Sequence, residues 1–294
     1  MTESAPPTEA DIPTLESVLR DSVHGSAWIS LRALEVLRHR AQELATAGAE
    51  DDVVRAEIVD LGERLAVARP PMVSVFNRVR RFLDQADEIA SSTDAGLAEK
   101  LSTLATTLLA EAEESEAQAV AHAAELVRGK CVFTLSRSST VLRAILQADP
   151  APRVVVAESL PGGEGRGVAQ ELAGAGIEVT LVPDSIMATV LSSAWDPAVD
   201  LVLVGADTVS PEGDVVNKSG TRLAALAARA GAIPCYVVLT EDKISTHDEI
   251  ALDESGLAVA TPRGEPRRVE PVFELTPAEL FTGLILSDGL RPVG

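Results

Sequence analysis

The segment GKCVFTLSRSSTVLRAILQADPAPRVVVAESLPGGEGRG (residues 129–167) decides the fold of this chain. It holds two short apolar runs, 131–135 and 153–157, with an amphipathic helical stretch at 141–146 between them. Short apolar runs that alternate with helices are typical of a parallel sheet whose two faces are both covered. The segment therefore predicts a β-strand, a helix and a second, parallel β-strand.

The same alternation continues toward the C-terminus. Gly176 follows one of the amphipathic stretches and is typical of a helix C-terminal cap. The motif Thr276-Pro277-Ala278-Glu279 has the pattern of a capping box with proline at the first helical position, and it predicts a last helix that ends at Leu286. We expect further strands at 177–182, 200–204 and 233–239, and further helices at 168–175, 185–192 and 218–230.

The N-terminal part of the chain shows a different pattern. Apolar residues recur at helical spacing, as at Leu31 and Leu34, and no β-branched alternation occurs. Residues 1–12 are rich in proline and acidic residues and are predicted to form a disordered tail. The predicted fold class is therefore α/β, with a helical N-terminal domain at 13–128 and a Rossmann-like C-terminal domain with a mainly parallel sheet at 129–294.

The composition is that of an acidic globular protein. Lys plus Arg total 25 and Asp plus Glu total 45, so the formal net charge is −20, and hydrophobic residues make up 46%. That hydrophobic content excludes a wholly disordered chain. The acidity argues against direct nucleic-acid binding, because phosphate contacts need clustered lysine and arginine. Only four basic residues are lysines, a bias that a salt-rich cytoplasm and a GC-rich genome explain equally well.

The sequence carries no sign of a metal site, a membrane span or secretion. Cys131 and Cys235 lie in apolar runs and are predicted to be reduced core thiols of a cytoplasmic protein. The His and Cys residues have no zinc-type spacing, so we expect no metal and no cofactor. No apolar stretch of about 18 residues occurs, and the first ten residues lack basic and apolar regions. We therefore expect neither a membrane span nor a secretory signal.

Candidate ligand-binding residues follow the predicted strands, because ligands bind at the carboxyl ends of the strands in such sheets. Ser136, Arg137 and Ser138 follow the first strand, and the glycine-rich turn after the second contains Gly165 and Arg166. This turn lacks the dinucleotide and P-loop patterns. Its backbone N–H groups and its arginine are still suited to hold a phosphate, with an ordinary tight loop as the alternative.

Three more polar residues follow later strands. Asp207 comes after an apolar run, and a carboxylate at a buried strand end caps a helix, pairs with a cation or works as an acid or base. Asn217 and Lys218 are expected to open a helix, where the ammonium suits a phosphate and the amide alternatively serves as a cap. In the N-terminal part, a helix start and a proline break carry the further candidates His24, Gly25, Ser26 (alternatively a cap) and Arg69.

Together these segments resemble the translation initiation factor 2B-like family. It includes the regulatory subunits of that factor, methylthioribose-1-phosphate isomerase and archaeal ribose-1,5-bisphosphate isomerase. The resemblance implies a helical domain on a Rossmann-like domain, a phosphorylated sugar or nucleotide bound between them, and assembly as dimers or higher oligomers. The matching segments are 202–207 (VLVGAD), 213–221 (GDVVNKSGT) and 234–238 (PCYVV), supported by 68–77, 134–143, 158–161 and 273–277, the last resembling the family's closing helix.

The resemblance also implies roles for single residues. In the family's isomerases a Cys and an Asp act on the sugar, and these positions correspond to Ser136 and Asp207. The histidine next to that Cys corresponds to Leu135. A phosphate-binding Arg corresponds to Leu160, and the Arg of an N-terminal Arg-Gly-Ala motif corresponds to His24.

The chain admits three functional hypotheses. The first is a regulatory, initiation-factor-2B-like protein that binds a sugar phosphate or nucleotide, since 134–143 is closest to the alpha-type regulatory subunit. The second is an aldose–ketose isomerase of the ribose-1,5-bisphosphate or methylthioribose-1-phosphate type, against which Ser136 counts because a hydroxyl is a far weaker acid than a thiol. The third is a structural subunit with an inactive pocket. We expect a homo-oligomer formed through the C-terminal domain.

Overall fold

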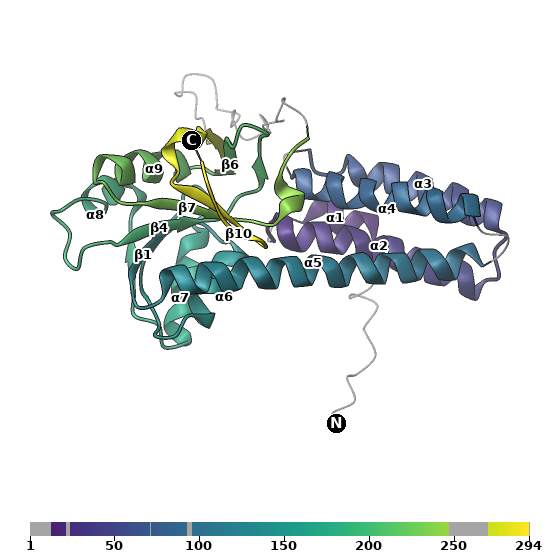
Figure 1. The fold of residues 1–294 in the computed structure, drawn as a ribbon, viewed down its shortest axis with the longest axis horizontal. Helices are drawn as coiled ribbons and strands as arrows, with labels where there is room; N and C mark the ends of the chain where they lie inside the picture. Colours follow the sequence, from purple (N-terminus) through teal and green to yellow (C-terminus); the bar gives the residue numbers. More distant parts are fainter. Residues whose placement is uncertain (1–12, 22–23, 71, 93–95, 247–269, 294) are drawn as a thin grey trace, which may run out of the picture. The chain divides into compact units, whose positions relative to one another are not determined.

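The computed structural model describes residues 13–21, 24–70, 72–92, 96–246 and 270–293. The chain forms two compact units (Figure 1). The helical unit contains the residues up to Arg69 together with Ser74–Ala112, and the sheet unit contains Pro70–Val73 together with Glu113–Gly294. Helix α5 (Leu97–Val127) contributes residues to both units.

The helical unit confirms the helical pattern predicted for the N-terminal part of the chain. Its core consists of fully buried apolar side chains from successive helices, among them Ile29, Leu37, Ile58, Phe82 and Leu101. No helix in the described part of the chain is both long and apolar enough to cross a membrane. The helices before α5 are α1 (Leu15–Arg20), α2 (Ser26–Thr46), α3 (Asp51–Ala66) and α4 (Val73–Ser92).

The sheet unit is built on a seven-stranded sheet with the order β10-β9-β7-β4-β1-β2-β3. All neighbouring strands pair in parallel except β9 and β10, which form an antiparallel hairpin at one edge. The predicted mainly parallel sheet is thus confirmed. The strands are β1 (Cys131–Thr134), β2 (Arg153–Ala157), β3 (Val179–Val182), β4 (Leu201–Val204), β7 (Cys235–Val238), β9 (Gly283–Leu286) and β10 (Gly289–Pro292).

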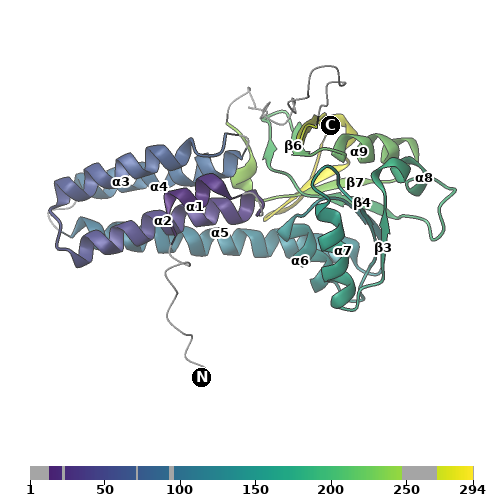
Figure 2. The same cartoon turned by 180° about the vertical axis from the view of Figure 1, so that it is seen from behind.

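Helices cover both faces of this sheet (Figures 1 and 2). Phe133 packs with the cluster that includes α8 (Met187–Val190) and α9 (Thr221–Ala230). Its neighbour Val132 packs on the other face, with α6 (Ser139–Gln147), α7 (Glu164–Gly174) and the end of α5. Because side chains alternate along a strand, burial of both faces requires an apolar residue at every position. This requirement explains the continuous apolar runs.

The predicted helix 218–230 is wrong at its start. Lys218 is the last residue of strand β6 (Val215–Lys218), which pairs with β5 (Thr208–Val209) and β8 (Phe273–Thr276) in a small antiparallel sheet. The helix begins only at Thr221, after Gly220, whose φ of 105° suits glycine. Two consecutive β-branched residues at the start of β6 favour a strand over a helix.

The predicted last helix, 276–286, is also wrong. Thr276 ends β8, Ala278–Leu280 form a single 3₁₀ turn, and Gly283–Leu286 form β9. Likewise, the predicted helix 185–192 is a 3₁₀ turn at Asp184–Ile186 followed by the four-residue α8. A local capping motif does not make a helix when the residues after it are an apolar run that completes a sheet.

Both cysteines are free and buried, as predicted for core thiols. Burial raises the pKa of the Cys235 thiol to about 12 and also raises the pKa of the Cys131 thiol. A thiol with a raised pKa holds little of the reactive thiolate at neutral pH. Neither cysteine is therefore suited to act as a nucleophile at neutral pH.

Candidate functional site

The carboxyl ends of the parallel strands meet at one edge of the seven-stranded sheet. From β1 the chain extends the sheet on one side through β2 and β3 and later on the other side through β4, so the order reverses between β1 and β4. Ligands bind at such a switch point. Ser138 follows β1, and a Cβ on Gly205, which follows β4, would lie 2.6 Å from the Ser138 hydroxyl. The two turns are therefore in direct contact.

Ser136 is held in an unusual backbone conformation at this edge. Its φ is 60°, in the left-handed region that residues other than glycine rarely adopt. Its N–H donates to the hydroxyl oxygen of Ser159 at 2.6 Å, and that hydroxyl donates to the Ala157 carbonyl at 3.1 Å. Ser159 is itself buried and has a φ of 65°. Strained conformations persist only where surrounding contacts enforce them, and they cluster at binding sites.

Asp184 in turn fixes the turn that carries Ser159. Its two carboxylate oxygens accept the N–H groups of Ser159 at 2.8 Å and Leu160 at 2.7 Å. Hydrogen bonds to an ionised carboxylate are stronger than neutral ones. Neither Ser159 nor Asp184 was among the sequence candidates, although each lies just after a predicted strand, where polar side chains are informative.

Replacing Asp184 with asparagine is expected to lower the free energy of unfolding by about 1–3 kcal/mol. An amide presents only one acceptor oxygen, so one of the two N–H groups that Asp184 now binds is left without a partner. Urea titration followed by circular dichroism measures the change. The exposed Asp196, replaced in the same way, should change stability by less than about 0.5 kcal/mol. Equal stability of the two variants would contradict the assigned role of Asp184.

Lys218 and Asn217 lie at the end of β6 and are both buried. The Lys218 ammonium pairs with the carboxylate of Glu164, the first residue of α7. The Asn217 amide donates to the Thr221 hydroxyl at 3.0 Å, and that hydroxyl donates to the Lys218 carbonyl at 2.7 Å. Since α7 follows β2, the ion pair brings Lys218 to the same edge as the β2 turn.

Asp207 is attached to the same strand. Its N–H donates to the Val216 carbonyl at 2.9 Å, which ties the end of β4 to β6 two residues before Lys218. The buried Lys243 also lies at this point, because its ammonium donates to the Ala206 carbonyl at 2.7 Å. Sequence reasoning did not single out Lys243; its position after β7, at the same edge, was the available signal.

Two arginine candidates are paired with surface carboxylates. The guanidinium of Arg137 lies 2.9 Å from the carboxylate of Glu171, and that of Arg166 lies 3.1 Å from the carboxylate of Glu158. Both arginines are about half exposed, where such pairs are weak and exchange readily with other anions. These contacts leave both arginines available to a ligand anion.

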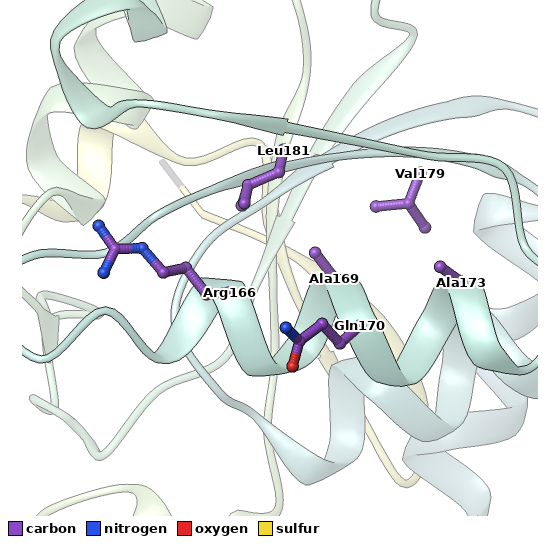
Figure 3. Close-up of a pocket in the computed structure, with 6 residues that line it drawn as sticks. All are labelled: Arg166, Ala169, Gln170, Ala173, Val179 and Leu181. Atoms are coloured by element: carbon purple, nitrogen blue, oxygen red, sulfur yellow. The ribbon is translucent and has the colours of Figure 1, made fainter.

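Arg166 also borders a hollow of about 310 Å³ between α7 and the edge strand β3. Figure 3 shows Leu181 and Val179 of β3 facing the alanines of α7 across this hollow. Arg166 is shared with the polar sheet edge, whereas Ser136 and Lys218 do not line the hollow. The lining residues are Arg166, Ala169, Gln170, Ala173, Val179 and Leu181.

Gly165 serves the packing of α7 against β2. A Cβ at this position would lie 2.9 Å from the carbonyl carbon of Ala157 and closer still to its oxygen. The N–H of Gly165 donates to the Glu158 carbonyl at 3.1 Å, so it is already engaged within the protein. The geometry therefore explains this glycine by close backbone approach.

The remaining four candidates belong to the helical unit and gather around Asp21. The His24 ring nitrogen Nδ1 lies 2.7 Å from an Asp21 carboxylate oxygen, and the guanidinium of Arg69 donates to the Asp21 carbonyl. Gly25 is the N-cap of α2, so the first N–H groups of this helix have no side-chain cap. The hydroxyl of Ser26 is buried and has no hydrogen-bond partner among the described residues.

No group of three or more His, Cys, Asp or Glu side chains within the described ranges has the geometry to hold a metal ion. The chemistry of the sheet edge is that of hydroxyls, an amide, two ammonium groups, two guanidinium groups and carboxylates. Such a set binds polar, anionic small molecules through hydrogen bonds and charge.

The comparisons with known proteins agree with this fold. The model of the Initiation factor 2 subunit family matches residues 22–292. A Pyrococcus horikoshii protein named translation initiation factor eIF-2B subunit 2-like is 29% identical over 289 residues, which cover 96% of each chain. The ribose 1,5-bisphosphate isomerase of Haloferax volcanii is 30% identical, and the match covers 97% of this chain and 88% of the isomerase.

A solved structure extends the agreement to three dimensions. The crystal structure of the translation initiation factor eIF-2B from Pyrococcus horikoshii OT3 aligns with a TM-score of 0.78 at 28% identity and covers 95% of both chains. The resemblance inferred from the sequence motifs is thus confirmed over nearly the whole length. On these grounds the chain belongs to the Initiation factor 2 subunit family.

Proposed function

We propose that this protein binds a phosphorylated sugar or a nucleotide at the polar sheet edge and acts as a regulatory, initiation-factor-2B-like protein. The observation that carries the proposal is the buried Lys218 ammonium at the edge where the Ser136 turn and the start of α7 lie. A lysine ammonium is a compact charge suited to phosphate, and a serine hydroxyl both donates to and accepts from sugar hydroxyls.

The proposed ligand-binding residues share the ability to hold an anion or a sugar hydroxyl. Those of the sheet unit present polar side chains near strand ends, except Gly165, whose missing Cβ lets the start of α7 lie against β2. Those of the helical unit surround the uncapped start of α2, a position that favours phosphate. The set comprises His24, Gly25, Ser26, Arg69, Ser136, Arg137, Ser138, Gly165, Arg166, Asn217 and Lys218.

An aldose–ketose isomerase is the second candidate function. It is favoured by the similarity to a protein named ribose 1,5-bisphosphate isomerase and by the position of Asp207 at a strand end of the same edge. In such a reaction Asp207 transfers the proton, and Ser136 only forms hydrogen bonds with the sugar. A serine hydroxyl lacks the acidity of the thiol that the family's isomerases use there, which is why we place regulation first.

Binding and turnover measurements distinguish the two functions. We expect isothermal titration to detect binding of ribose 1,5-bisphosphate or of a nucleoside monophosphate. We expect neither the wild type nor Ser136→Cys to form an isomerised product from ribose 1,5-bisphosphate. Brisk turnover by the wild type would overturn the regulatory function. In that case Asp207→Asn should abolish turnover, while the affinity for the sugar phosphate stays within about tenfold of the wild-type value. Absence of binding to all these compounds would contradict both functions and favour a structural subunit.

The proposal includes the setting in which the protein works. We place it in the cytoplasm as a homo-oligomer assembled through residues 129–294, with no direct nucleic-acid contact. The acidic net charge of −20 supports the last point, because it opposes association with phosphate backbones.

A further inference from the structure

The ion pair between Lys218 and Glu164 has an uneven exposure. The Lys218 side chain is 6% exposed, whereas the Glu164 side chain is 35% exposed. The Lys218 side chain is therefore largely buried, and its ammonium is already paired with the carboxylate of a more exposed side chain. Any external anion that is to reach the ammonium must take the place of this carboxylate.

The carboxylate of Glu164 does not make all the hydrogen bonds that it can accept. One oxygen contacts the Lys218 ammonium, while the other, Oε2, is buried and has no hydrogen-bond partner among the described residues. A buried acceptor without a donor is unfavourable, so this position holds the carboxylate less firmly than a fully bonded pair would. The Gly162 turn leaves room for it, since a Cβ there would lie 2.7 Å from Oε2.

The surroundings of Glu164 favour a negative charge, whether it belongs to a side chain of the protein or to a ligand. As the first residue of α7, an eleven-residue helix, it lies at the end where the helix dipole attracts negative charge. Lys218 adds a full positive charge to the same point. A carboxylate of the protein thus occupies a position with the electrostatics of a phosphate site.

We propose that Glu164 is a built-in competitor that occupies the Lys218 ammonium and must move outward before the phosphate of a ligand binds there. The inference rests on the proposed function, because it concerns the same sheet edge. It makes Glu164 a specificity-determining residue: a ligand binds only if its contacts exceed those of the departing carboxylate, so a free phosphate ion is rejected while a larger sugar phosphate is accepted.

The test removes the competing charge and keeps the shape. Glu164→Gln is expected to bind inorganic phosphate and ribose 5-phosphate at least tenfold more tightly than the wild type in isothermal titration. Glu164→Asp, whose shorter side chain reaches the ammonium less well, should show a smaller gain. Glu125→Gln, which removes an exposed carboxylate of α5 that pairs with Arg128, should leave both affinities unchanged. The gain should vanish in the double variant Glu164→Gln/Lys218→Met.

The outcomes separate this inference from the proposed function. If the wild type binds ribose 5-phosphate and Glu164→Gln binds it equally or more weakly, Glu164 is a ligand contact or a structural partner and the inference is overturned, while the proposed function stands. If neither protein binds either probe, nor ribose 1,5-bisphosphate or a nucleoside monophosphate, both are overturned. Thermal unfolding of each variant verifies that it is folded. If Glu164→Gln is not folded, the affinities of Glu164→Asp and of the wild type are compared instead.

Discussion

Replacing Lys218 with methionine is expected to reduce the affinity for a ribose phosphate by about 100-fold, which corresponds to about 2.7 kcal/mol. Methionine keeps the apolar length of the side chain and removes its charge. The loss is large because the ammonium is buried, where a phosphate has little water to replace the missing contact. Isothermal titration of both proteins with ribose 1,5-bisphosphate measures it.

The matched control is Lys100→Met, which removes a charge from an exposed position on α5. Its affinity should equal that of the wild type. Lys218→Met is also expected to unfold at lower urea concentration than the control, because Glu164 then keeps a partly buried charge without its cation. Ligand affinity that stays within threefold of the wild type would show that Lys218 does not bind the phosphate.

The second large effect concerns stability. Gly165→Ala is expected to lower the free energy of unfolding by about 3 kcal/mol or more, since the new Cβ would overlap the Ala157 carbonyl and force α7 away from β2. Urea unfolding midpoints measure this change. Displacement of α7 would also move Glu164 and, with it, the Lys218 pair.

A glycine two residues later supplies the control, for which the expected change in the free energy of unfolding has the opposite sign. Gly167 lies in the same helix, and a Cβ there would meet nothing within 4 Å. Gly167→Ala is therefore expected to stabilise the protein by about 0.5–1 kcal/mol through the better helix propensity of alanine. If both variants destabilise the protein equally, the role of close packing at Gly165 is refuted.

The sequence predicted the central sheet well because burial on two faces leaves little choice of residue. In β1, Val132 and Phe133 face opposite helical layers, so polar residues are excluded from both positions. The start of α9 and the last predicted helix failed for the opposite reason. Thr276 belongs to a capping motif, but it pairs with Val215 across the small sheet, and pairing between distant segments outweighed the local signal.

The candidate site was predicted only in part, because some of its features depend on local sequence and others on pairing between distant segments. Strand ends can be located from local sequence, which led to Ser136 and Asp207. Lys218 was found at an expected helix start, which the structure shows to be the end of β6. The partners of these residues come from remote segments: Glu164 lies 54 positions before Lys218, and Ser159 lies 23 positions after Ser136. Such pairs depend on strand order and register, which one sequence does not reveal.

The order of the seven strands has a consequence for protein synthesis. With β1 in place, β2 and β3 add in turn on one side, and β4, β7, β9 and β10 add in turn on the other. Every strand that leaves the ribosome thus meets a free edge, and none has to insert between two strands that are already paired. The edge at β7 stays unpaired until the β9–β10 hairpin emerges, so this edge is a point of aggregation risk for the nascent chain during that interval.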